Sequence, residues 1–377
     1  MVHVYRLTQA IPHDTITNMN IYYDARWTRT DFHDGISRYG AGIIEGFKEN
    51  NIPITILIKD LRQLKMLPGD IPYLLVNEPL SVKELFIAYK LNRLGADVVV
   101  SPFQIIGTLG RKYKLIVTLH DTIFYLHPKA PTFLSLSQRI VWRLFHMAKW
   151  PQRLLLNNAD KVATVSNYSK NSISDLKLTK REIVVIYNAP SLEQSQMQRG
   201  KEKTNNIIYM GSFMPYKNVE VLIKGMAFLP KDFTLHLLSK CMDDRMQELK
   251  KLIEPGVKVV FHNGVSDDEY IKLLQSAYCL ASASKEEGFG LPIIEAQTIG
   301  TPVVCSDMTI FHEVAGDGAL FFDFNSPKQF ADQVSKLQDQ KFLQSLVDEG
   351  HKQAEKFTWK QSAKTLYKIC QDLYNNH

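Results

Sequence analysis

The sequence contains few cysteines and no cluster of metal-binding residues. Its 377 residues include four cysteines, none in a Cys-x-x-Cys pair or a Cys/His cluster: Cys241, Cys279, Cys305 and Cys370. This spacing argues against a structural zinc site and against a disulfide framework. We expect four ordinary thiols in a reducing compartment.

Long apolar runs are also missing. No window approaches the ~20 apolar residues of a membrane-spanning helix. The first 20 residues lack a sustained apolar stretch and are interrupted by Pro12 and Asp14, so they do not resemble a secretory signal. We therefore expect a cytoplasmic protein that could still rest on the inner face of a membrane.

Nucleic-acid binding lacks its usual sequence signals, because there is no Lys/Arg-rich tract and no aromatic-basic RNA motif. The net charge of +6 is nevertheless uneven. Residues 1–190 carry 24 Lys and Arg against 15 Asp and Glu, whereas residues 191–377 carry 21 against 24. The first half thus has either an anionic partner, such as a lipid surface or a phosphate-bearing acceptor, or an ordinary solvated basic face.

Short β-branched runs alternate with longer amphipathic segments, which is typical of βαβ units on a parallel sheet. The length suits two α/β domains. We predict an N-terminal domain over 1–190, a polar linker over 191–206, a C-terminal domain over 207–358 and a last helix over 359–377. The predicted strands are 20–24, 54–58, 73–76, 97–100, 115–118, 161–165 and 183–186, then 207–210, 234–238, 257–261, 278–281, 302–305 and 319–322. The predicted helices are 35–48, 81–93, 134–157, 218–228, 243–252, 267–275, 292–299, 327–338 and 360–374.

The most specific local pattern is SKEEGFGLPIIEA, from Ser284 to Ala296. It follows a predicted strand and opens a helix near Pro292, a residue suited to the first helical turn. Gly288 and Gly290 let backbone amides approach a ligand, and the helix N-terminus adds partial positive charge. A strand, a glycine turn and a helix in this order predict an anion-binding site. Glu287 and Glu295 beside it suit the hydroxyl groups of a sugar or ribose.

Three other segments follow predicted strands. GSFMPYKN begins at Gly211 and places Lys217 where an ammonium could neutralise phosphate. His120 and Asp121 follow the strand 115–118, at the carboxyl end where open α/β sheets place their ligands. DGISRY, from Asp34 to Tyr39, opens the first helix, and its Arg38 could bind a ligand or simply lie on the surface.

These motifs together resemble the retaining glycosyltransferases of family 4, also called glycosyl transferases group 1. The spacing from Glu287 to Glu295 resembles the family's E-x7-E motif, and GSFMPYKN resembles its G-S/R-x-x-x-R-K segment. The resemblance runs from about Asn20 to the C-terminus. Departures occur at Ser212 and Tyr216, where many members carry arginine, and at Ser37, where a second glycine is commoner.

The resemblance implies an α/β fold of two facing Rossmann-like domains (the GT-B fold), with the C-terminal helix crossing back to the first domain. It assigns catalytic roles to His120, Asp121 and Glu287, and an acceptor or phosphate contact to Arg38. It assigns donor binding to Gly35, Gly211, Ser212, Lys217, Gly288, Phe289, Gly290, Leu291 and Glu295. In the family the second glutamate binds the ribose of the nucleotide.

The implied reaction transfers a hexose from a nucleotide diphosphate sugar to a hydroxyl of a glycan or lipid-linked acceptor with retention of configuration. Among hexoses, the resemblance favours mannose. No DxD motif stands in a metal-binding context, so we expect no metal cofactor. A non-catalytic nucleotide-sugar-binding protein and a GT-B-type epimerase remain alternatives. A nicotinamide dehydrogenase is disfavoured because no G-x-G-x-x-G follows the first strand.

One further segment, Arg139 to Arg153, mixes basic residues with Trp142, Phe145 and Trp150. It indicates either a core-facing helix with a solvated edge or a helix that touches an anionic membrane.

Overall fold

A computed structural model describes residues 19–128, 135–192, 196–200 and 204–376. The described chain divides into two compact units. Unit 1 comprises residues 19–128, 135–189 and 358–376, and unit 2 comprises 190–192, 196–200 and 204–357. Residues 1–18 lie outside the described residues, and they include most of the segment that does not resemble a secretory signal. Part of the predicted linker also lies outside them.

Unit 1 is built on a seven-stranded parallel sheet with the order β3-β2-β1-β4-β5-β6-β7. Its five inner strands are mostly buried runs of β-branched and other apolar residues, as expected for a parallel sheet covered on both faces, whereas the edge strands β3 and β7 are more exposed. The strands are β1 (Ile21–Asp24), β2 (Thr55–Ile58), β3 (Tyr73–Leu75), β4 (Val98–Ser101), β5 (Lys114–Thr118), β6 (Lys161–Thr164) and β7 (Glu182–Val185).

The helices of unit 1 lie in the connections between these strands, except α14, which follows the last strand and helices of unit 2. They are α1 (Gly35–Glu49), α2 (Ile87–Arg93), α3 (Ile123–Leu126), α4 (Leu136–Ala148), α5 (Trp150–Asn157), α6 (Asn167–Asp175) and the C-terminal α14 (Trp359–Asn375), with 3-10 helices η1 (Ala25–Trp27), η2 (Leu61–Met66) and η3 (Val82–Phe86). Ser166 caps α6 by accepting a hydrogen bond from the backbone N–H of Ser169 at 3.0 Å.

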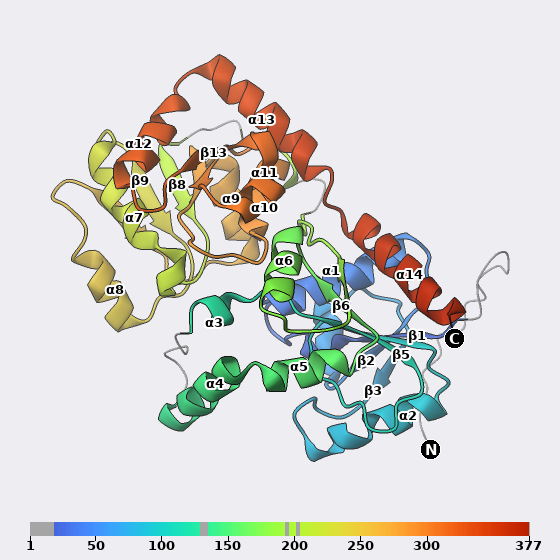
Figure 1. Cartoon of the computed structure of the whole chain (residues 1–377). Coiled ribbons are helices and arrows are strands. Elements are labelled where there is room, and N and C mark those ends of the chain that lie inside the picture. Colours follow the sequence, from blue (N-terminus) through green and yellow to red (C-terminus); the bar gives the residue numbers. More distant parts are fainter. Residues whose placement is uncertain (1–18, 129–134, 193–195, 201–203, 377) are drawn as a thin grey trace. The chain divides into compact units, whose positions relative to one another are not determined.

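Helix α14 joins unit 1, as the predicted return of the last helix requires. Two glycines of α1 allow it to pack closely there (Figure 1). A Cβ atom at Gly42 would lie 2.1 Å from the ring of Trp359, and one at Gly46 would lie 2.1 Å from the carbonyl oxygen of Trp359. Any larger residue at either position would therefore push the two helices apart.

Unit 2 repeats the plan with a six-stranded parallel sheet in the order β10-β9-β8-β11-β12-β13. Its strands are β8 (Asn206–Tyr209), β9 (Thr234–Leu237), β10 (Lys258–Phe261), β11 (Cys279–Ser282), β12 (Val303–Ser306) and β13 (Ala319–Phe322). Its helices are α7 (Val219–Gly225), α8 (Asp243–Lys250), α9 (Asp267–Ser276), α10 (Leu291–Ile299), α11 (Thr309–Ala315), α12 (Pro327–Lys336) and α13 (Gln340–Ala354), with η5 (Pro215–Lys217), η6 (Met226–Phe228) and η7 (Gly316–Gly318).

The strand predictions agree with the structure to within one or two residues, whereas the helix predictions need corrections. The single helix predicted over 134–157 was wrong in one respect: the described part is broken into α4 and α5 at Lys149, whose φ is 48°. A left-handed residue cannot continue a right-handed helix. The predicted helix ranges do not include α3, α6, α11 or α13. No helix among the described residues is long and apolar enough to cross a membrane.

Candidate functional site

Each sheet has a point where the strand order reverses direction. In unit 1 this point lies between β1 and β4, and in unit 2 it lies between β8 and β11. Loops that leave the carboxyl ends of these two strands run to opposite faces of the sheet and leave a crevice, where open α/β sheets bind ligands. The loops in question follow β1 and β4 in unit 1, and β8 and β11 in unit 2.

In unit 2, the loop after β11 leads directly into α10. Gly290 is the N-cap residue of α10 and has φ 103°, a left-handed conformation that glycine adopts without strain. A Cβ atom there would also lie 3.0 Å from the ring of Phe311. The neighbouring Phe289 is buried, with its ring perpendicular to that of Phe357 at 5.5 Å. This packing holds the N-terminus of α10 at the carboxyl edge of the sheet.

Glu287 lies in this loop and forms an ion pair with Lys217 from the loop after β8. The distance between Nζ of Lys217 and Oε1 of Glu287 is 2.5 Å, and the hydroxyl of Ser284 donates to the same oxygen at 2.9 Å. The Lys217 and Glu287 side chains are 16% and 14% exposed. The pair thus bridges the two loops beside the strand-order reversal and keeps a partly open face.

The loop after β8 carries the other predicted donor-binding residues. The N–H of Gly211 donates to the hydroxyl of Ser239 at 3.2 Å, while Ser212 is exposed and its carbonyl accepts from Tyr209 at 2.6 Å. The N–H of Lys285 donates to the carbonyl of Tyr216 at 2.7 Å, a backbone bond between the two loops. The loops after β8 and β11 therefore form one hydrogen-bonded structure.

Glu295 lies one turn into α10, after Leu291 at the start of the helix. It is 3% exposed, and its Oε2 accepts a hydrogen bond from the hydroxyl of Tyr270 on α9 at 2.9 Å. A buried carboxylate needs such partners, because an unsatisfied charge is costly. Sequence reasoning missed Tyr270, since nothing in the local pattern of α9 connects it to Glu295.

In unit 1, His120 lies after β5 and turns towards the chain after β4. Its Nε2 lies 2.8 Å from the carbonyl oxygen of Pro102, so Nε2 carries the hydrogen, because a carbonyl only accepts. Burial lowers the pKa of His120, against the opposing effects of this hydrogen bond and of Asp34. The imidazole is therefore neutral at pH 7, held by this bond and by an edge contact with Tyr39 at 4.9 Å.

Asp121 has a structural role next to His120. Its Oδ1 accepts a hydrogen bond from the backbone N–H of Ile123 at 2.9 Å, at the start of the short helix α3. This bond fixes the turn that follows β5 and so the direction in which His120 leaves the strand.

The loop before α1 is held by Ser37 rather than by the commoner glycine. Its fully buried hydroxyl accepts from the N–H of Arg29 at 3.1 Å and bonds Nδ1 of His33 at 2.8 Å. Asp34 caps α1 by accepting from the N–H of Ser37 at 2.9 Å, directly before the exposed Gly35. Arg38 is half-buried in the first turn. The serine that replaces the commoner glycine thus ties this loop together through two hydrogen bonds.

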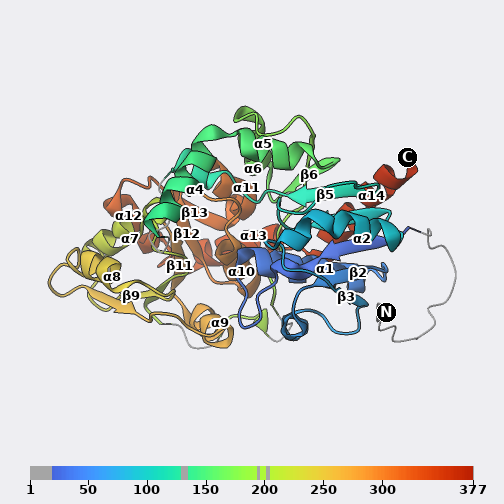
Figure 2. The ribbon, with the colours of Figure 1, turned by 90° about the horizontal axis from the view of Figure 1, so that it is seen from below.

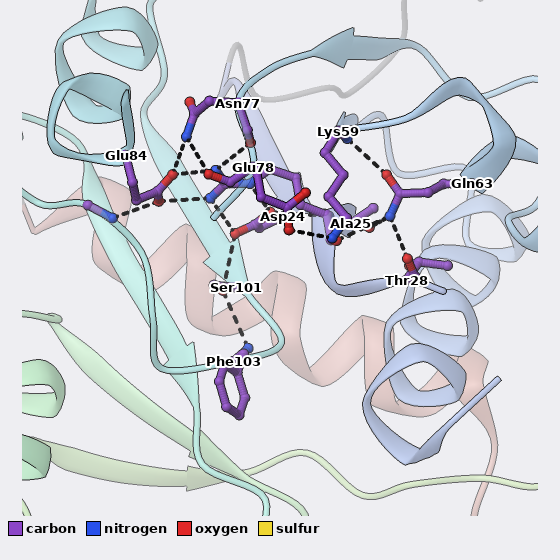
Figure 3. A network of polar contacts seen from close by, with 12 residues as sticks. Asp24, Ala25, Thr28, Lys59, Gln63, Asn77, Glu78, Glu84, Ser101 and Phe103 are labelled. Carbon is purple, nitrogen blue, oxygen red and sulfur yellow. Dashed lines mark hydrogen bonds and ion pairs between the residues drawn. The ribbon is translucent and has the colours of Figure 1, made fainter. Parts of the chain in front are cut away.

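A buried charge cluster lies at the strand-order reversal of unit 1, and the sequence analysis missed it (Figure 3). The fully buried guanidinium of Arg26 contacts both oxygens of Asp24, at 2.7 and 2.9 Å, and both oxygens of Glu84, at 2.6 and 3.0 Å. Glu84 also accepts from Asn77 at 2.5 Å and from the N–H of Gly107 at 2.9 Å. These bonds tie the loop after β1 to the segments around residues 77–84 and 107.

The described residues contain no group of three or more His, Cys, Asp or Glu side chains able to hold a metal ion.

The predicted site residues themselves fall into two sets. Gly211, Ser212, Lys217, Glu287, Gly288, Phe289, Gly290, Leu291 and Glu295 belong to unit 2, whereas Gly35, Arg38, His120 and Asp121 belong to unit 1.

Two family models match the chain in succession. The model "Glycosyltransferase Family 4" matches residues 35–194, and the model "Glycosyl transferases group 1" matches residues 191–356. The two matches together cover most of the described chain, and each corresponds to one of the units.

Curated relatives include several mannosyltransferases. The O-antigen chain mannosyltransferase RfbU of Salmonella typhimurium is 30% identical over 225 residues, which are 59% of this chain and 60% of that protein. The MMP alpha-(1->4)-mannosyltransferase of Mycolicibacterium hassiacum is 27% identical over 237 residues, 59% of this chain and 57% of that protein. The matched part of the chain thus spans about three-fifths of the length of these relatives.

Solved structures with similar architecture are more distant in sequence. Sucrose-phosphate synthase from Thermosynechococcus elongatus superposes with a TM-score of 0.71 at 17% identity, over 96% of this chain and 100% of that one. Anabaena HepE in complex with UDP and glucose superposes with a TM-score of 0.68 at 16% identity, over 94% and 100%. Since family models match both units and the architecture agrees along almost the whole chain, the protein belongs to glycosyltransferase family 4 and has the GT-B fold.

Proposed function

We propose that the protein transfers a hexose, specifically mannose, from a nucleotide diphosphate sugar to a hydroxyl of a glycan or lipid-linked acceptor, with retention of configuration. The observation that carries this proposal is the pairing of Lys217 with Glu287 beside the N-terminus of α10, at the strand-order reversal of unit 2. Family membership supports a transferase, and the named functions of the relatives support mannose and a polysaccharide acceptor.

The donor diphosphate is assigned to the loops after β8 and β11. Lys217 supplies a positive charge, and the N-terminus of α10 supplies backbone N–H groups and a partial positive charge. An ammonium has three donors, so Lys217 can contact a phosphate oxygen while it keeps its bond to Glu287. Glu287 then holds Lys217 in place and offers its remaining oxygen lone pairs to sugar hydroxyls.

The ribose of the nucleotide is assigned to Glu295. Because Tyr270 already bonds one oxygen and only 3% of the residue is exposed, the carboxylate is held in one orientation. A ribose hydroxyl has to approach it along the loop that Gly288 to Leu291 form. The fixed orientation of Glu295 lowers the entropic cost of binding.

In unit 1 we assign the acceptor to the carboxyl edge of the sheet. Arg38 offers positive charge to a phosphate-bearing acceptor, whereas Gly35, at the N-terminus of α1, is assigned to the donor. His120 and Asp121 are assigned catalytic roles, with the neutral imidazole available as an acceptor at Nδ1 because Nε2–H bonds Pro102. Its lowered pKa keeps it neutral at pH 7, which suits contact with a hydroxyl.

The proposed chemistry uses no nucleophile from the chain. As the bond from the anomeric carbon to the diphosphate breaks, the acceptor hydroxyl attacks the same face, and its proton passes to the departing phosphate oxygen. Negative charge grows on the diphosphate in this step, and Lys217 and the amides of the loop stabilise it. No metal ion takes part in the proposed step, so activity should persist in excess chelator.

The test is a thermal-shift and transfer screen against UDP-, GDP-, ADP- and dTDP-sugars. One donor should raise the melting temperature of the wild type, and Glu295→Gln, which keeps the shape of the side chain, should abolish the shift. Glu248→Gln, an exposed change on α8, is the matched control and should leave the shift intact. If no donor stabilises the wild type, the assigned donor site is wrong.

Product analysis separates the alternatives. NMR of the product should show the anomeric configuration of the donor, whereas the opposite anomer would contradict retention. Free epimerised sugar formed without an acceptor would favour an epimerase, and donor binding without any turnover would favour a sensor. Loss of activity with chelator, restored by Mg²⁺ or Mn²⁺, would overturn metal independence.

A further inference from the structure

Helix α4 exposes most of its apolar residues. None of its thirteen residues is buried. The exposed fractions are 78% for Leu136, 59% for Ile140, 67% for Val141, 62% for Leu144 and 72% for Met147. Scattered exposed apolar side chains are ordinary, but five on one helix form a patch.

These residues share one side of the helix. At 100° per residue, Leu136, Met147, Ile140, Leu144 and Val141 fall within one continuous arc of about 140°. Arg139 and Arg143 border this arc on one side.

The opposite side of α4 packs on its own unit. The ring of Trp142 lies 5.2 Å from that of Phe124, and the ring of His146 lies 5.1 Å from that of Tyr125. The helix is therefore anchored through its aromatic side, and its aliphatic side faces outward. The core-facing interpretation of the segment from Arg139 to Arg153 thus applies only to the aromatic side of α4, and contact with a membrane stays a prediction.

Helix α5 follows α4 directly after Lys149 (Figures 1 and 2) and also exposes apolar side chains. Trp150 is 64% exposed and Leu154 is 58% exposed. A cavity of about 290 Å³ opens beyond α5, lined mainly by apolar side chains that include Leu85, Ile106 and Leu155. We call the exposed apolar residues of α4 and α5 the α4–α5 face.

A basic groove adjoins this face. It has a volume of about 670 Å³, lies between α5, α6 and the start of β7, and is lined by five cationic side chains: Arg153, Lys170, Lys177, Lys180 and Arg181. Its acidic residue, Glu182, is bonded to Lys161 at 2.6 Å. Such a groove attracts phosphate groups.

Acidic residues are absent from the whole connecting segment. Between Asp121 and Asp160 the sequence contains five Lys and Arg and no Asp or Glu. A surface made for a second copy of this chain or for a neutral lipid does not need this one-sided charge. A protein surface that binds an anionic bilayer uses both parts: an apolar face that enters the acyl boundary and cations that contact the lipid phosphates.

We infer that the α4–α5 face and the adjoining basic groove dock this protein on an anionic phospholipid bilayer. The aliphatic side chains of α4 enter the boundary between headgroups and acyl chains. Arg139 and Arg143 extend their charged ends to the headgroups, and the groove holds lipid phosphates. This inference is independent of the proposed transferase activity, because it concerns binding to vesicles that carry no acceptor.

The experiment is vesicle flotation of the full chain without donor. Vesicles of equal parts phosphatidylglycerol and phosphatidylcholine should carry the wild type upward, and vesicles of phosphatidylcholine alone should carry at least about tenfold less. Salt at 1 M, where the Debye length is about 3 Å, should release most of the bound protein.

Two variants remove the two halves of the surface separately. Leu144→Glu with Met147→Glu should lower flotation by about tenfold or more, because charged groups replace inserted apolar ones. Lys177→Glu with Lys180→Glu should lower it to a similar degree on anionic vesicles. Phe228→Glu is the matched control, since Phe228 is 58% exposed but belongs to unit 2, and it should float like the wild type.

Several outcomes would overturn the inference. They are absence of flotation, equal binding to neutral vesicles, or wild-type flotation of both double variants. A wild-type dimer in sedimentation that Leu144→Glu with Met147→Glu dissociates would show that the face binds a second copy instead. Each variant is compared by circular dichroism and melting temperature, so a folding defect in one double variant leaves the other as the test.

Discussion

The two units have the same sheet plan but place charge differently at their strand-order reversals. In unit 1 the carboxyl end of β1 leads into Arg26, which is fully buried with Asp24 and Glu84. In unit 2 the loop after β8 carries Lys217, which meets Glu287 while both side chains remain partly exposed. The position in the fold is equivalent, yet the surroundings of the charges are not.

The difference separates a structural ion cluster from the proposed donor site. The hydrogen-bonding groups of Arg26 are directed at carboxylates and at the carbonyl of Asn77, and a solute cannot reach them. The Lys217–Glu287 pair has partners on one side and an open side next to a helix N-terminus. The same reversal in strand order therefore fixes loops in unit 1 and presents charge in unit 2.

The largest expected effect comes from breaking the buried cluster. Arg26→Met should destabilise unit 1 by about 3–5 kcal/mol, because Asp24 and Glu84 would remain buried without their counter-ion. Hydrogen exchange should speed up in peptides of β1 and β4 but not in those of unit 2. The control is Arg62→Met, which removes an exposed ion pair with Asp60 and should change little. Uniformly faster exchange in both units would show that the Arg26 cluster does not stabilise unit 1 alone.

The corresponding change in unit 2 should affect chemistry more than stability. Lys217→Met should lower kcat/KM by about 100-fold or more, because charge growing on the diphosphate loses a stabilising cation. Lys217→Arg should keep part of the activity. Steady-state kinetics with the donor identified by the screen measures kcat/KM for both variants. The control is Lys224→Met, on the exposed side of α7. Unchanged kinetics would remove Lys217 from the donor site.

The glycine turn before α10 offers a smaller effect. Gly290→Ala should cost about 1–3 kcal/mol, because a left-handed backbone conformation disfavours a Cβ, and the Cβ would also press on Phe311. We expect weaker donor binding with a lower melting temperature. Gly69→Ala, where a Cβ meets no atom within 4 Å, should change neither donor binding nor the melting temperature. Equal effects of the two changes would show that the turn at Gly290 needs no glycine.

The smallest expected effect is the pH dependence of unit 1. The pKa of His120 in the folded protein is lowered from 6.5 by burial, so the unfolded chain takes up a proton more readily than the folded one. The resulting contribution to stability is complete well above pH 6.5 and is lost as pH falls towards the folded pKa. Urea unfolding from pH 8 to about pH 5 should therefore show a smaller loss for His120→Gln than for the wild type. The exposed His312→Gln serves as the control, and equal slopes for His120→Gln and the wild type would contradict the assignment.

The sequence predicted the elements and the order of the motifs well, because those depend on neighbours in the chain. Apolar periodicity located every strand of both sheets, and the resemblance led to the family that the models confirm. The break at Lys149 was missed, since the segment keeps a helical pattern on both sides of it. The site residues were proposed from motifs, but their partners Tyr270 and Ser284 were not found.

The sequence by itself determined the two sheets and the glycine turn that starts α10. Each of these depends on residues a few positions apart. Only the tertiary structure decided that Lys217 meets Glu287, that Tyr270 fixes Glu295, that Arg26 is buried with Glu84, and that α14 packs on α1. These pairs come from distant parts of the chain, and no local pattern specifies which side chains the packing of helices on a sheet will bring together.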